Sequence, residues 1–168
     1  MDGKTISYSR VIMTQQMLPY DANPAGNVHG GVIMKLIDNA AAVVASRHAR
    51  CNVVTASVDR LDFLAPVFVA DLVHLKASLN HVGSTSMEIG VRVECENLLT
   101  GTVRHTVSAY LTYVALDAQG NPAPVVPVVP ETPEDQRRLN AAARRKEIRS
   151  AERRIERENA KVRDNADA

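Results

Sequence analysis

The stretch NPAGNVHGGVIMKLID, residues 23–38, joins a run of small, flexible residues to an apolar pattern that is typical of a helix. From about Gly30 to Arg47, apolar side chains recur every three or four residues, the repeat that gathers them on one side of a helix. The sequence therefore predicts one long helix with a continuous buried face. The residues of that face are Ile33, Leu36, Ile37, Ala40, Ala41 and Val44.

Four β-rich runs follow this helix, at residues 52–67, 71–82, 86–99 and 102–116, and a short run at Arg10–Leu18 precedes it. In the second and third runs apolar and polar residues alternate strictly, which predicts strands with one buried face. Breaks at Ala65-Pro66, at Gly83 and around residues 97–101 predict that neighbouring strands are antiparallel and linked by hairpins. The economical arrangement is an α+β fold in which a curved antiparallel sheet wraps the long helix.

The C-terminal part of the chain has a different composition. Residues 119–135 (QGNPAPVVPVVPETPED) are rich in proline, so we expect an extended segment that follows a surface rather than joins a sheet. Thr132, Pro133 and Glu134 mark a helix start, and the helix is predicted to continue to about Arg163. We therefore divide the chain into a domain of residues 1–125 and a Pro-rich linker with a charged helix, residues 126–168. The mixed charges favour a solvated helix, with docking on a partner subunit and nucleic-acid binding as alternatives.

The overall composition excludes several classes of protein. The chain has 168 residues, is 45% hydrophobic and carries a formal net charge of +1. It can bury one core, and it has no overall field that would attract nucleic acid or a membrane. Cys51 and Cys95 are too few for a disulfide framework, and the first ten residues lack the apolar core of a signal peptide. We expect a cytoplasmic protein without nucleic-acid or membrane partners.

The start of the long helix is the candidate site. Gly30 and Gly31 either form a tight entry turn or leave backbone N–H groups open to a developing oxyanion. Asp38 lies two turns further on, in a helix that the sheet should cover, where an unpaired acid is costly. His29 is either a general base or a neutral hydrogen-bonding residue. The histidines show no ligand spacing, so no metal site is expected.

At this point the pattern resembles a known family. The blocks DANPAGNVHGGVIMKLIDNAA, TASVDRLDFLAPV, SMEIGVRVE, SAYLTYVAL and VPET are similar to those of the hotdog-fold acyl-CoA thioesterases of the cytosolic acyl-CoA hydrolase type. The resemblance covers roughly residues 11–134. It implies a helix wrapped by a strongly curved sheet, and a homodimer with sites shared across its interface, often assembled as a trimer of dimers. It further implies a hydrolase that converts fatty acyl-CoA to fatty acid and CoA without a cofactor.

The resemblance also implies roles for individual residues. Asp38 would activate water or attack the thioester, and Asn23, or second Asn27, would position the water or the thioester from the opposite subunit. The N–H of Gly30 or Gly31 would polarise the carbonyl, with His29 beside it. Ser57 matches a hydroxyl near the catalytic acid. The CoA groove would be lined by Gly83, Ser84, Thr85 and Ser86.

Two other functions compete with hydrolysis. A hydratase acting on an enoyl thioester usually needs a His with an acid in a differently arranged helix motif, which this sequence lacks. A non-catalytic acyl-CoA sensor would need an added DNA-binding module, for which the ten residues before the first strand leave no room. Acyl-CoA hydrolysis is therefore the preferred prediction, with the sensor as its alternative.

Overall fold

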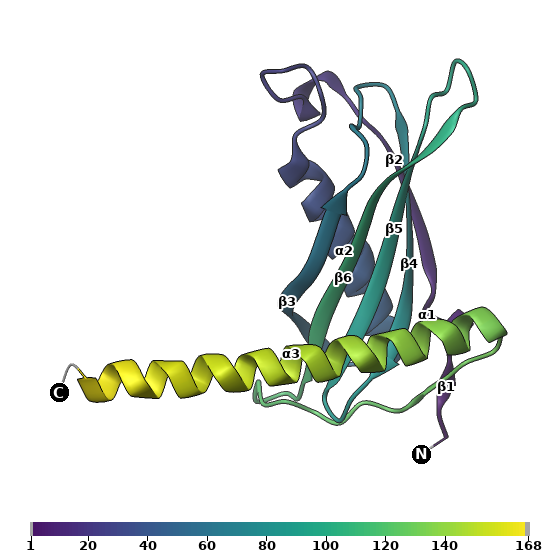
Figure 1. Cartoon of the computed structure of the whole chain (residues 1–168). Helices are drawn as coiled ribbons and strands as arrows, with labels where there is room; N and C mark the ends of the chain where they lie inside the picture. The colour runs from purple at the N-terminus through teal and green to yellow at the C-terminus, as the bar shows by residue number, and fades with distance from the viewer. Residues whose placement is uncertain (1, 167–168) are drawn as a thin grey trace.

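The computed structural model describes residues 2–166 and contains one long sheet between two helices (Figure 1). Residues 167 and 168, the end of the predicted C-terminal segment, lie outside the described residues. The elements in chain order are β1 (Lys4–Thr5), α1 (Ile6–Ser9), β2 (Val11–Gln16), the 3₁₀ turn η1 (Pro19–Asp21), α2 (Gly30–Ala49), β3 (Asn52–Phe63), β4 (Leu72–Val82), β5 (Ser86–Glu96), β6 (Val103–Leu116), β7 (Val128–Val129) and α3 (Pro133–Ala166).

The main sheet has five antiparallel strands in the order β2-β4-β5-β6-β3. Helix α2 packs against one face of this sheet, which we call the inner face, and α3 crosses the other, outer face (Figure 1). The predicted α+β class and the long helix against an antiparallel sheet are therefore confirmed.

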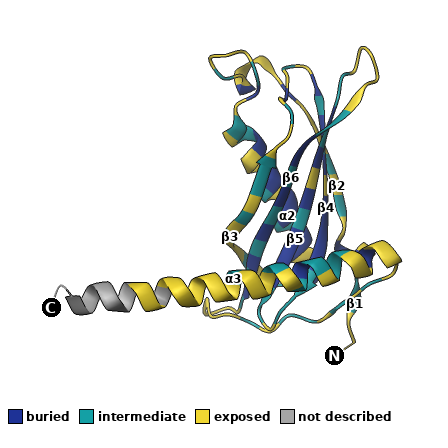
Figure 2. Cartoon of the chain, viewed as in Figure 1, coloured by how far each residue is buried: buried dark blue, intermediate teal, exposed yellow. Residues whose placement is uncertain are grey.

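The core lies between α2 and the inner face. The apolar residues of α2 predicted to be buried are all buried, because their helical spacing turns them toward the sheet. Alternate residues of the central strands meet them and are also buried (Figure 2). These strand residues include Val73, Leu75, Leu79, Met87, Ile89, Val91, Val107 and Leu111.

The prediction of hairpins between all neighbouring strands is wrong at Ala65-Pro66. Strands β4–β5 and β5–β6 are adjacent antiparallel pairs, but β3 pairs with β6 and β4 pairs with β2. The chain therefore crosses from the edge strand β3, past β6 and β5, to the interior strand β4 between Phe63 and Leu72. Turn residues indicate where a strand ends, whereas its partner depends on contacts far apart in sequence. As a result β3 is an edge strand.

Helix α3 differs from the solvated helix that its charges favoured. Its first half lies across the outer face, where Arg145 and Arg149 reach Glu88 on β5 and Arg149 also reaches Asp59 on β3. The side chains of Glu88 and Asp59 are only 2% and 6% exposed. Further along, the helix passes β3 and extends away from the sheet with exposed side chains at residues 150–156 (Figures 1 and 2).

The Pro-rich segment is mostly extended, as predicted, but it also joins a small second sheet. Val128 and Val129 pair in parallel with Lys4 and Thr5 of β1. The buried His48, in the last turn of α2, donates from Nε2 to the carbonyl of Val126 at 2.9 Å. These contacts fasten the segment beside the C-terminal end of α2. No helix in the described residues is long and apolar enough to cross a membrane.

Candidate active site

Asp38 is held by two hydroxyl groups at the middle of α2. The phenol of Tyr113 on β6 donates to Asp38 Oδ1 at 2.6 Å and lies 2.9 Å from the Asp38 carbonyl oxygen. The hydroxyl of Thr55 on β3 donates to the same Oδ1 at 2.8 Å. Tyr113 is buried and Asp38 is half-buried. The acid predicted to be costly on this helix is therefore compensated by hydrogen bonds on one oxygen.

The second oxygen of Asp38 is open. Among the described residues, nothing donates a hydrogen bond to Oδ2 or forms an ion pair with the carboxylate. Burial, reinforced by the hydrogen bond to Asp38, raises the pKa of Tyr113 well above its usual range. Tyr113 therefore remains a proton donor, which requires Asp38 to be the acceptor. The arrangement fixes a carboxylate with one oxygen free to act as base or nucleophile.

Thr55 occupies the position beside Asp38 that the resemblance suggested for Ser57. The pairing of β3 with β6 shifts register between Thr55 and Ser57, so that Thr55 pairs with Tyr113 and Ser57 with Thr112. This β-bulge turns Thr55 to the inner face and Ser57 to the outer face. There Ser57 donates to Asp59 at 2.5 Å. Regular alternation along the strand gives no sign of this change of face.

The two glycines at the start of α2 differ in whether the backbone N–H has a hydrogen-bond partner. His29 is the N-cap, and its Nδ1 accepts a hydrogen bond from the Gly31 N–H at 2.9 Å. In neutral His29 the proton is thus on Nε2. The Gly31 N–H is already used, whereas no acceptor among the described residues takes the N–H of Gly30. Gly30 is therefore the better oxyanion donor of the two, at the positive end of the helix dipole.

Asn23 and Asn27 lie in the loop that precedes this helix start. The loop is a tight turn, with Asn23 N–H donating to the Asn27 carbonyl at 2.7 Å and Asn23 Oδ1 accepting from Ala25 N–H at 2.9 Å. Both asparagines and Gly30 line an open cleft of about 400 Å³. The other lining residues are mainly apolar and include Val28, Ile33, Phe63, Leu64 and Val67.

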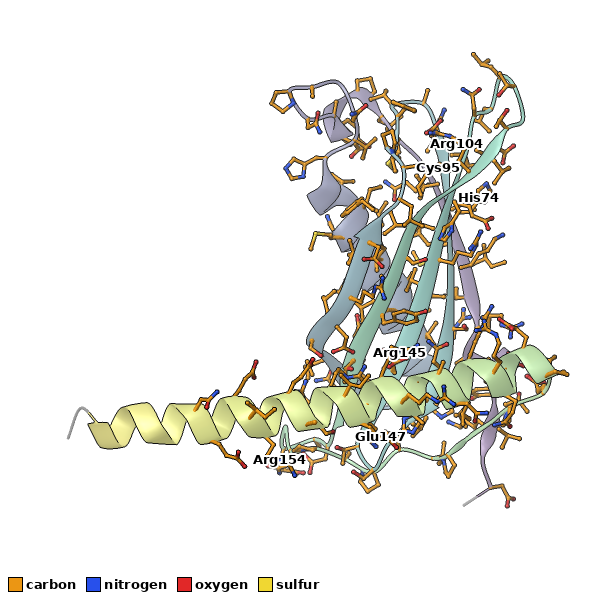
Figure 3. All side chains as sticks on the ribbon, viewed as in Figure 1. His74, Cys95, Arg104, Arg145, Glu147 and Arg154 are labelled. Atoms are coloured by element: carbon orange, nitrogen blue, oxygen red, sulfur yellow. The ribbon has the colours of Figure 1, made fainter. Side chains whose placement is uncertain are left out.

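A second loop, residues 64–71, supports the asparagine loop. Val28 N–H donates to the Val67 carbonyl at 2.9 Å, and Asn27 forms a β-bridge with Phe68. Arg104 fixes this support, because it donates to the carboxylate of buried Asp71 at 2.7 Å and stacks on the Phe68 ring at 4.9 Å. Figure 3 shows Arg104 at the end of the sheet distant from α3.

Within one chain the predicted catalytic residues form two groups rather than one. Gly30, His29 and Asn23 cluster at the start of α2, while Asp38 lies two helical turns away, roughly 12 Å along the axis. Asp38 does not line the cleft that contains Asn23 and Gly30. One chain therefore brings together Asp38 with Thr55 and Tyr113, and separately Asn23 with Gly30.

The residues predicted to line a CoA groove form the turn between β4 and β5. Gly83 N–H donates to the Ser86 carbonyl at 2.7 Å, and the Ser84 carbonyl accepts from Val125 N–H at 3.0 Å. The carbonyl of Thr85 accepts from Ala115 N–H at 3.0 Å. The turn thus lies against the Pro-rich segment, at the end of the sheet near α3 (Figure 1).

Comparison with known proteins assigns this fold to a class. A family model described as the thioesterase superfamily matches residues 25–102, which include Asp38 and the start of α2. An uncharacterized acyl-CoA thioester hydrolase of Bacillus subtilis is 42% identical over 137 residues, covering 82% of this chain and 80% of that protein. The rat cytosolic acyl coenzyme A thioester hydrolase is 36% identical over 140 residues, which are 82% of this chain and 37% of the rat protein.

Solved structures agree with these relatives. An acyl-CoA hydrolase from Bacillus cereus superposes with a TM-score of 0.88 at 37% identity, covering 96% of this chain and 98% of that chain. An apo-hexameric acyl-CoA thioesterase superposes with a TM-score of 0.85 at 42% identity, covering 89% and 97% of the two chains. The sheet and its central helix are thus those of a hotdog-fold thioesterase.

The chain belongs to the thioesterase superfamily. The resemblance to acyl-CoA thioesterases and the prediction of a thioester hydrolase are therefore confirmed. Two site residues, Thr55 and Tyr113, were not predicted from the sequence. In the sequence, Tyr113 occupies one of the alternating positions that a core residue would take. Its hydrogen-bond partner, Asp38, is distant in the chain. The pairing of β3 with β6 was the missing information.

Proposed function

We propose that this protein hydrolyses the thioester of fatty acyl-CoA to a fatty acid and CoA, with Asp38 as base or nucleophile. The observation that carries the proposal is the half-buried Asp38 carboxylate, held at Oδ1 by Tyr113 and Thr55 and open at Oδ2. The apolar lining of the cleft at Gly30 suits an acyl chain. The relatives named acyl-CoA thioester hydrolases support the same activity.

In the general-base form of the reaction, Asp38 takes a proton from water as the water oxygen bonds to the thioester carbon. The carbonyl oxygen becomes negative and is stabilised by the Gly30 N–H. The carbon–sulfur bond then breaks, and the CoA thiolate leaves with the proton that Asp38 received. In the nucleophilic form, Asp38 Oδ2 bonds to the carbon itself, and the carbon–sulfur bond breaks to release the CoA thiolate. Water then cleaves the resulting anhydride into the fatty acid and the free Asp38 carboxylate, and a proton released in this step is taken up by the thiolate. Neither form needs a cofactor.

The two groups of residues meet if two chains pair through β3. This edge strand is 12 residues long and exposes Val54, Val58 and Phe63, each between 41% and 50%. Such an edge presents unpaired backbone N–H and C=O groups that can pair with a strand of another chain. Symmetric pairing of two copies of one edge strand across a twofold axis must be antiparallel. The Phe63 end of one β3, next to Gly30, then lies beside the Thr55 end of the other, next to Asp38.

This geometry supports two complete sites per homodimer, each with Asp38 from one chain and Asn23 and Gly30 from its partner. Three solved Staphylococcus aureus acyl-CoA hydrolase structures are of variants in which an Asn, an Asp or a Thr is replaced by Ala. Those three positions follow one another at the same intervals as Asn23, Asp38 and Thr55 here. The match supports these residues as the catalytic set, with Asn23 orienting water or the thioester.

Two broader features follow from the same relatives. Hexameric thioesterases among the structural neighbours support a trimer of dimers for this chain. The relatives named cytosolic support a cytoplasmic location.

The Asp38→Asn variant tests the proposal, since it keeps the side chain's size and removes its charge. We expect kcat for a medium-chain acyl-CoA to fall on the order of 10²- to 10⁴-fold with KM little changed, the loss typical of a general base. Thiol release is the measurement, across acyl-CoAs of increasing length. A kcat that stays above about a tenth of wild type would exclude Asp38 as the catalytic acid. No hydrolysis by the wild-type protein, combined with tight acyl-CoA binding, would favour the sensor instead.

A further inference from the structure

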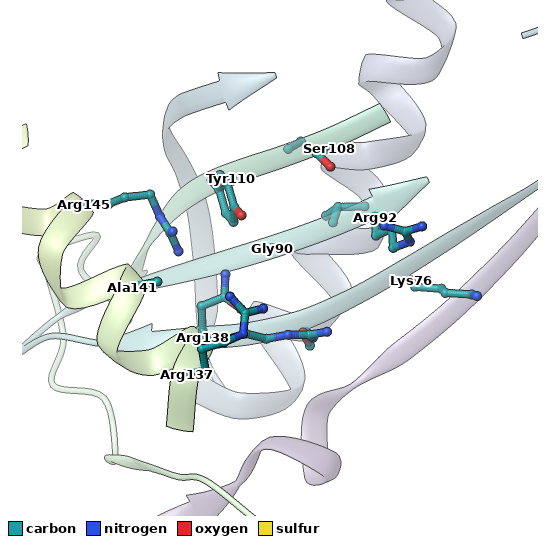
Figure 4. A pocket seen from close by; sticks show the side chains of 13 residues that line it. Lys76, Gly90, Arg92, Ser108, Tyr110, Arg137, Arg138, Ala141 and Arg145 are labelled. Carbon is teal, nitrogen blue, oxygen red and sulfur yellow. The ribbon is translucent and has the colours of Figure 1, made fainter. Parts of the chain in front are cut away.

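A second cavity lies on the outer face of the sheet, under the first half of α3 (Figure 4). We call it the outer pocket. It measures about 180 Å³ and is bordered by strands β4, β5 and β6 below and by α3 along one side. The full thickness of the sheet separates it from Asp38 in the same chain. Its cationic side chains are Lys76, Arg92, Arg137, Arg138 and Arg145.

Small residues keep the floor of the outer pocket open. Ser78, Gly90 and Ser108 contribute no bulky side chain, and Ala141 is the small residue among those of α3 that line the cavity. A Cβ atom at Gly90 would lie 2.6 Å from the Asn80 amide nitrogen, so only glycine leaves room for that amide beside the pocket. The strands therefore offer hydroxyl and amide groups at the bottom of a ring of cations.

Tyr110 holds one of these cations in place. The Arg145 guanidinium stacks on the Tyr110 ring at 3.9 Å from its centre and donates to buried Glu88 at 2.6 Å (Figure 4). The other end of the pocket has Lys76 and Arg92, and Arg137 and Arg138 lie between the two ends along α3 (Figure 4). Positively charged side chains of α3 and of strands β4 and β5 thus border the cavity.

The acids around the outer pocket do not neutralise it. The five cations of the pocket, together with Arg149 beside them, share four carboxylates, which leaves a surplus of two positive charges. Paired arginines and lysine lower the pKa of both Glu94 and Glu134 to about 2, so both acids are already ionised near neutral pH and the surplus is constant there. The pairs are Glu94 with Lys76 and Arg92, Glu134 with Arg137 and Arg138, Glu88 with Arg145 and Arg149, and Asp59 with Arg149.

We propose that the outer pocket binds a phosphate group. A phosphate monoester carries about −1.5 to −2 charges near neutral pH, which matches the surplus. Guanidinium groups present paired N–H donors that fit phosphate oxygens, and serine hydroxyls supply further donors. The phosphate belongs either to a CoA molecule, reached from a neighbouring chain, or to a free phosphate-bearing compound. The site does not depend on hydrolysis at Asp38, because binding is measured without turnover.

The test removes two cations at the rim of the pocket. Arg137 and Arg138 have side chains 68% and 41% exposed, so R137Q/R138Q should fold normally. The matched control is R144Q/R153Q, which removes two exposed arginines of α3 that do not line the outer pocket. Calorimetric titration uses inorganic phosphate, CoA and 3′-dephospho-CoA with the full chain. We expect R137Q/R138Q to weaken phosphate binding on the order of tenfold or more, and the control to resemble wild type.

A second variant tests the cavity without changing charge. Ala141→Leu should fill the outer pocket from α3 and weaken phosphate binding to a similar extent. If the phosphate is that of CoA, R137Q/R138Q also weakens CoA binding, raises KM for acyl-CoA, and inorganic phosphate competes with CoA. If it belongs to a free compound, CoA binding and KM stay unchanged while phosphate binding is lost. The proposal is overturned if neither phosphate nor CoA binding differs among wild type, R137Q/R138Q and Ala141→Leu.

Discussion

At the scale of single residues, the site depends on which atoms of Asp38 are occupied. Tyr113 and Thr55 both donate to Oδ1, and this leaves Oδ2 free for chemistry. An acid held by two hydroxyls on one oxygen has a fixed direction, which a carboxylate on a flexible surface lacks. Side chains of β3 and β6 therefore orient the Asp38 carboxylate, although the residue itself belongs to α2.

Removing one of these hydroxyls tests their role. In Tyr113→Phe, Asp38 loses its shortest hydrogen bond, and we expect kcat to fall on the order of tenfold, since a hydrogen bond to a charged group contributes about 1.5–3 kcal/mol. Tyr110→Phe is the matched control, because Tyr110 lies on the same strand but faces the outer pocket. Steady-state hydrolysis of an acyl-CoA is the measurement. Equal kcat values for the two variants would show that Tyr113 does not orient Asp38.

The sequence predicted Asp38 and the glycine start of α2 because both lie on one helix that the spacing of apolar residues reveals. It could not separate Gly30 from Gly31, since that difference depends on the direction of the His29 ring. The resemblance implied Ser57 as the hydroxyl near Asp38, whereas Thr55 takes that place, because a β-bulge has no clear signal in an alternating pattern. Residues whose role depends on strand pairing were the ones that the sequence missed.

At the scale of elements, α3 is fastened to the sheet by charge. Arg145 and Arg149 compensate Glu88 and Asp59, two acids that are almost fully buried on the outer face. In the sequence Glu88 occupies a polar position of an alternating strand, which is the face not buried against the long helix. The pattern correctly places the acid on the face away from α2, but α3, which covers that face, comes from a distant part of the chain.

Two truncations separate the fastened half of α3 from its protruding half. A chain ending at Ser150 keeps both arginines and should unfold at nearly the wild-type denaturant concentration. A chain ending at Arg144 leaves both acids without a cationic partner, and we expect it to lose at least about 3 kcal/mol of unfolding free energy. Asp59→Asn with Glu88→Gln should restore part of that loss. Equal stability of the two truncated chains would contradict this role of the arginines.

The C-terminal end of α2 has a pH-dependent element in His48. Burial lowers the pKa of His48, and its Nδ1 has no partner among the described residues. The unfolded chain therefore takes up a proton near the usual pKa of about 6.5, before the folded chain does. The contribution of neutral His48 is fully present above that pH and is lost as pH falls below it.

We expect the unfolding free energy of the wild-type protein to decrease between pH 7.5 and 5.5. His48→Gln keeps an N–H donor toward Val126 but does not titrate, so its stability should decrease less over the same interval. Urea unfolding at the two pH values is the measurement. An identical decrease in both proteins would mean that His48 remains ionisable in the fold.

At the scale of the whole molecule, the sequence established the helix and the strands but not the edge of the sheet. Local periodicity predicted α2 and the alternating strands, because the spacing of apolar residues along the chain is enough to distinguish a helix from a strand. The order of strands depends on the crossover between Phe63 and Leu72, and only that crossover makes β3 an exposed edge. The proposed dimer, and with it the joining of Asn23 to Asp38, follows from the position of β3.

Subunit mixing tests this shared site most directly. Asp38→Asn and Asn23→Ala are each expected to have low kcat when assembled alone. In a mixed dimer, one site has Asp38 from the Asn23→Ala chain and Asn23 from the Asp38→Asn chain, and is intact. Random pairing of equal amounts makes half of the dimers mixed with one good site each, so about a quarter of wild-type activity should return after refolding together.

The control mixture combines Asp38→Asn with Tyr113→Phe, whose defects lie in the same half of the site. No mixed dimer then contains a site with both Asp38 and Tyr113 intact in one chain, so this mixture should not gain activity. The measurement is the steady-state rate of acyl-CoA hydrolysis before and after refolding the chains together. A rise to about a quarter of wild type in the first mixture alone supports a site shared between two chains. A first mixture no more active than the average of its two components would contradict it.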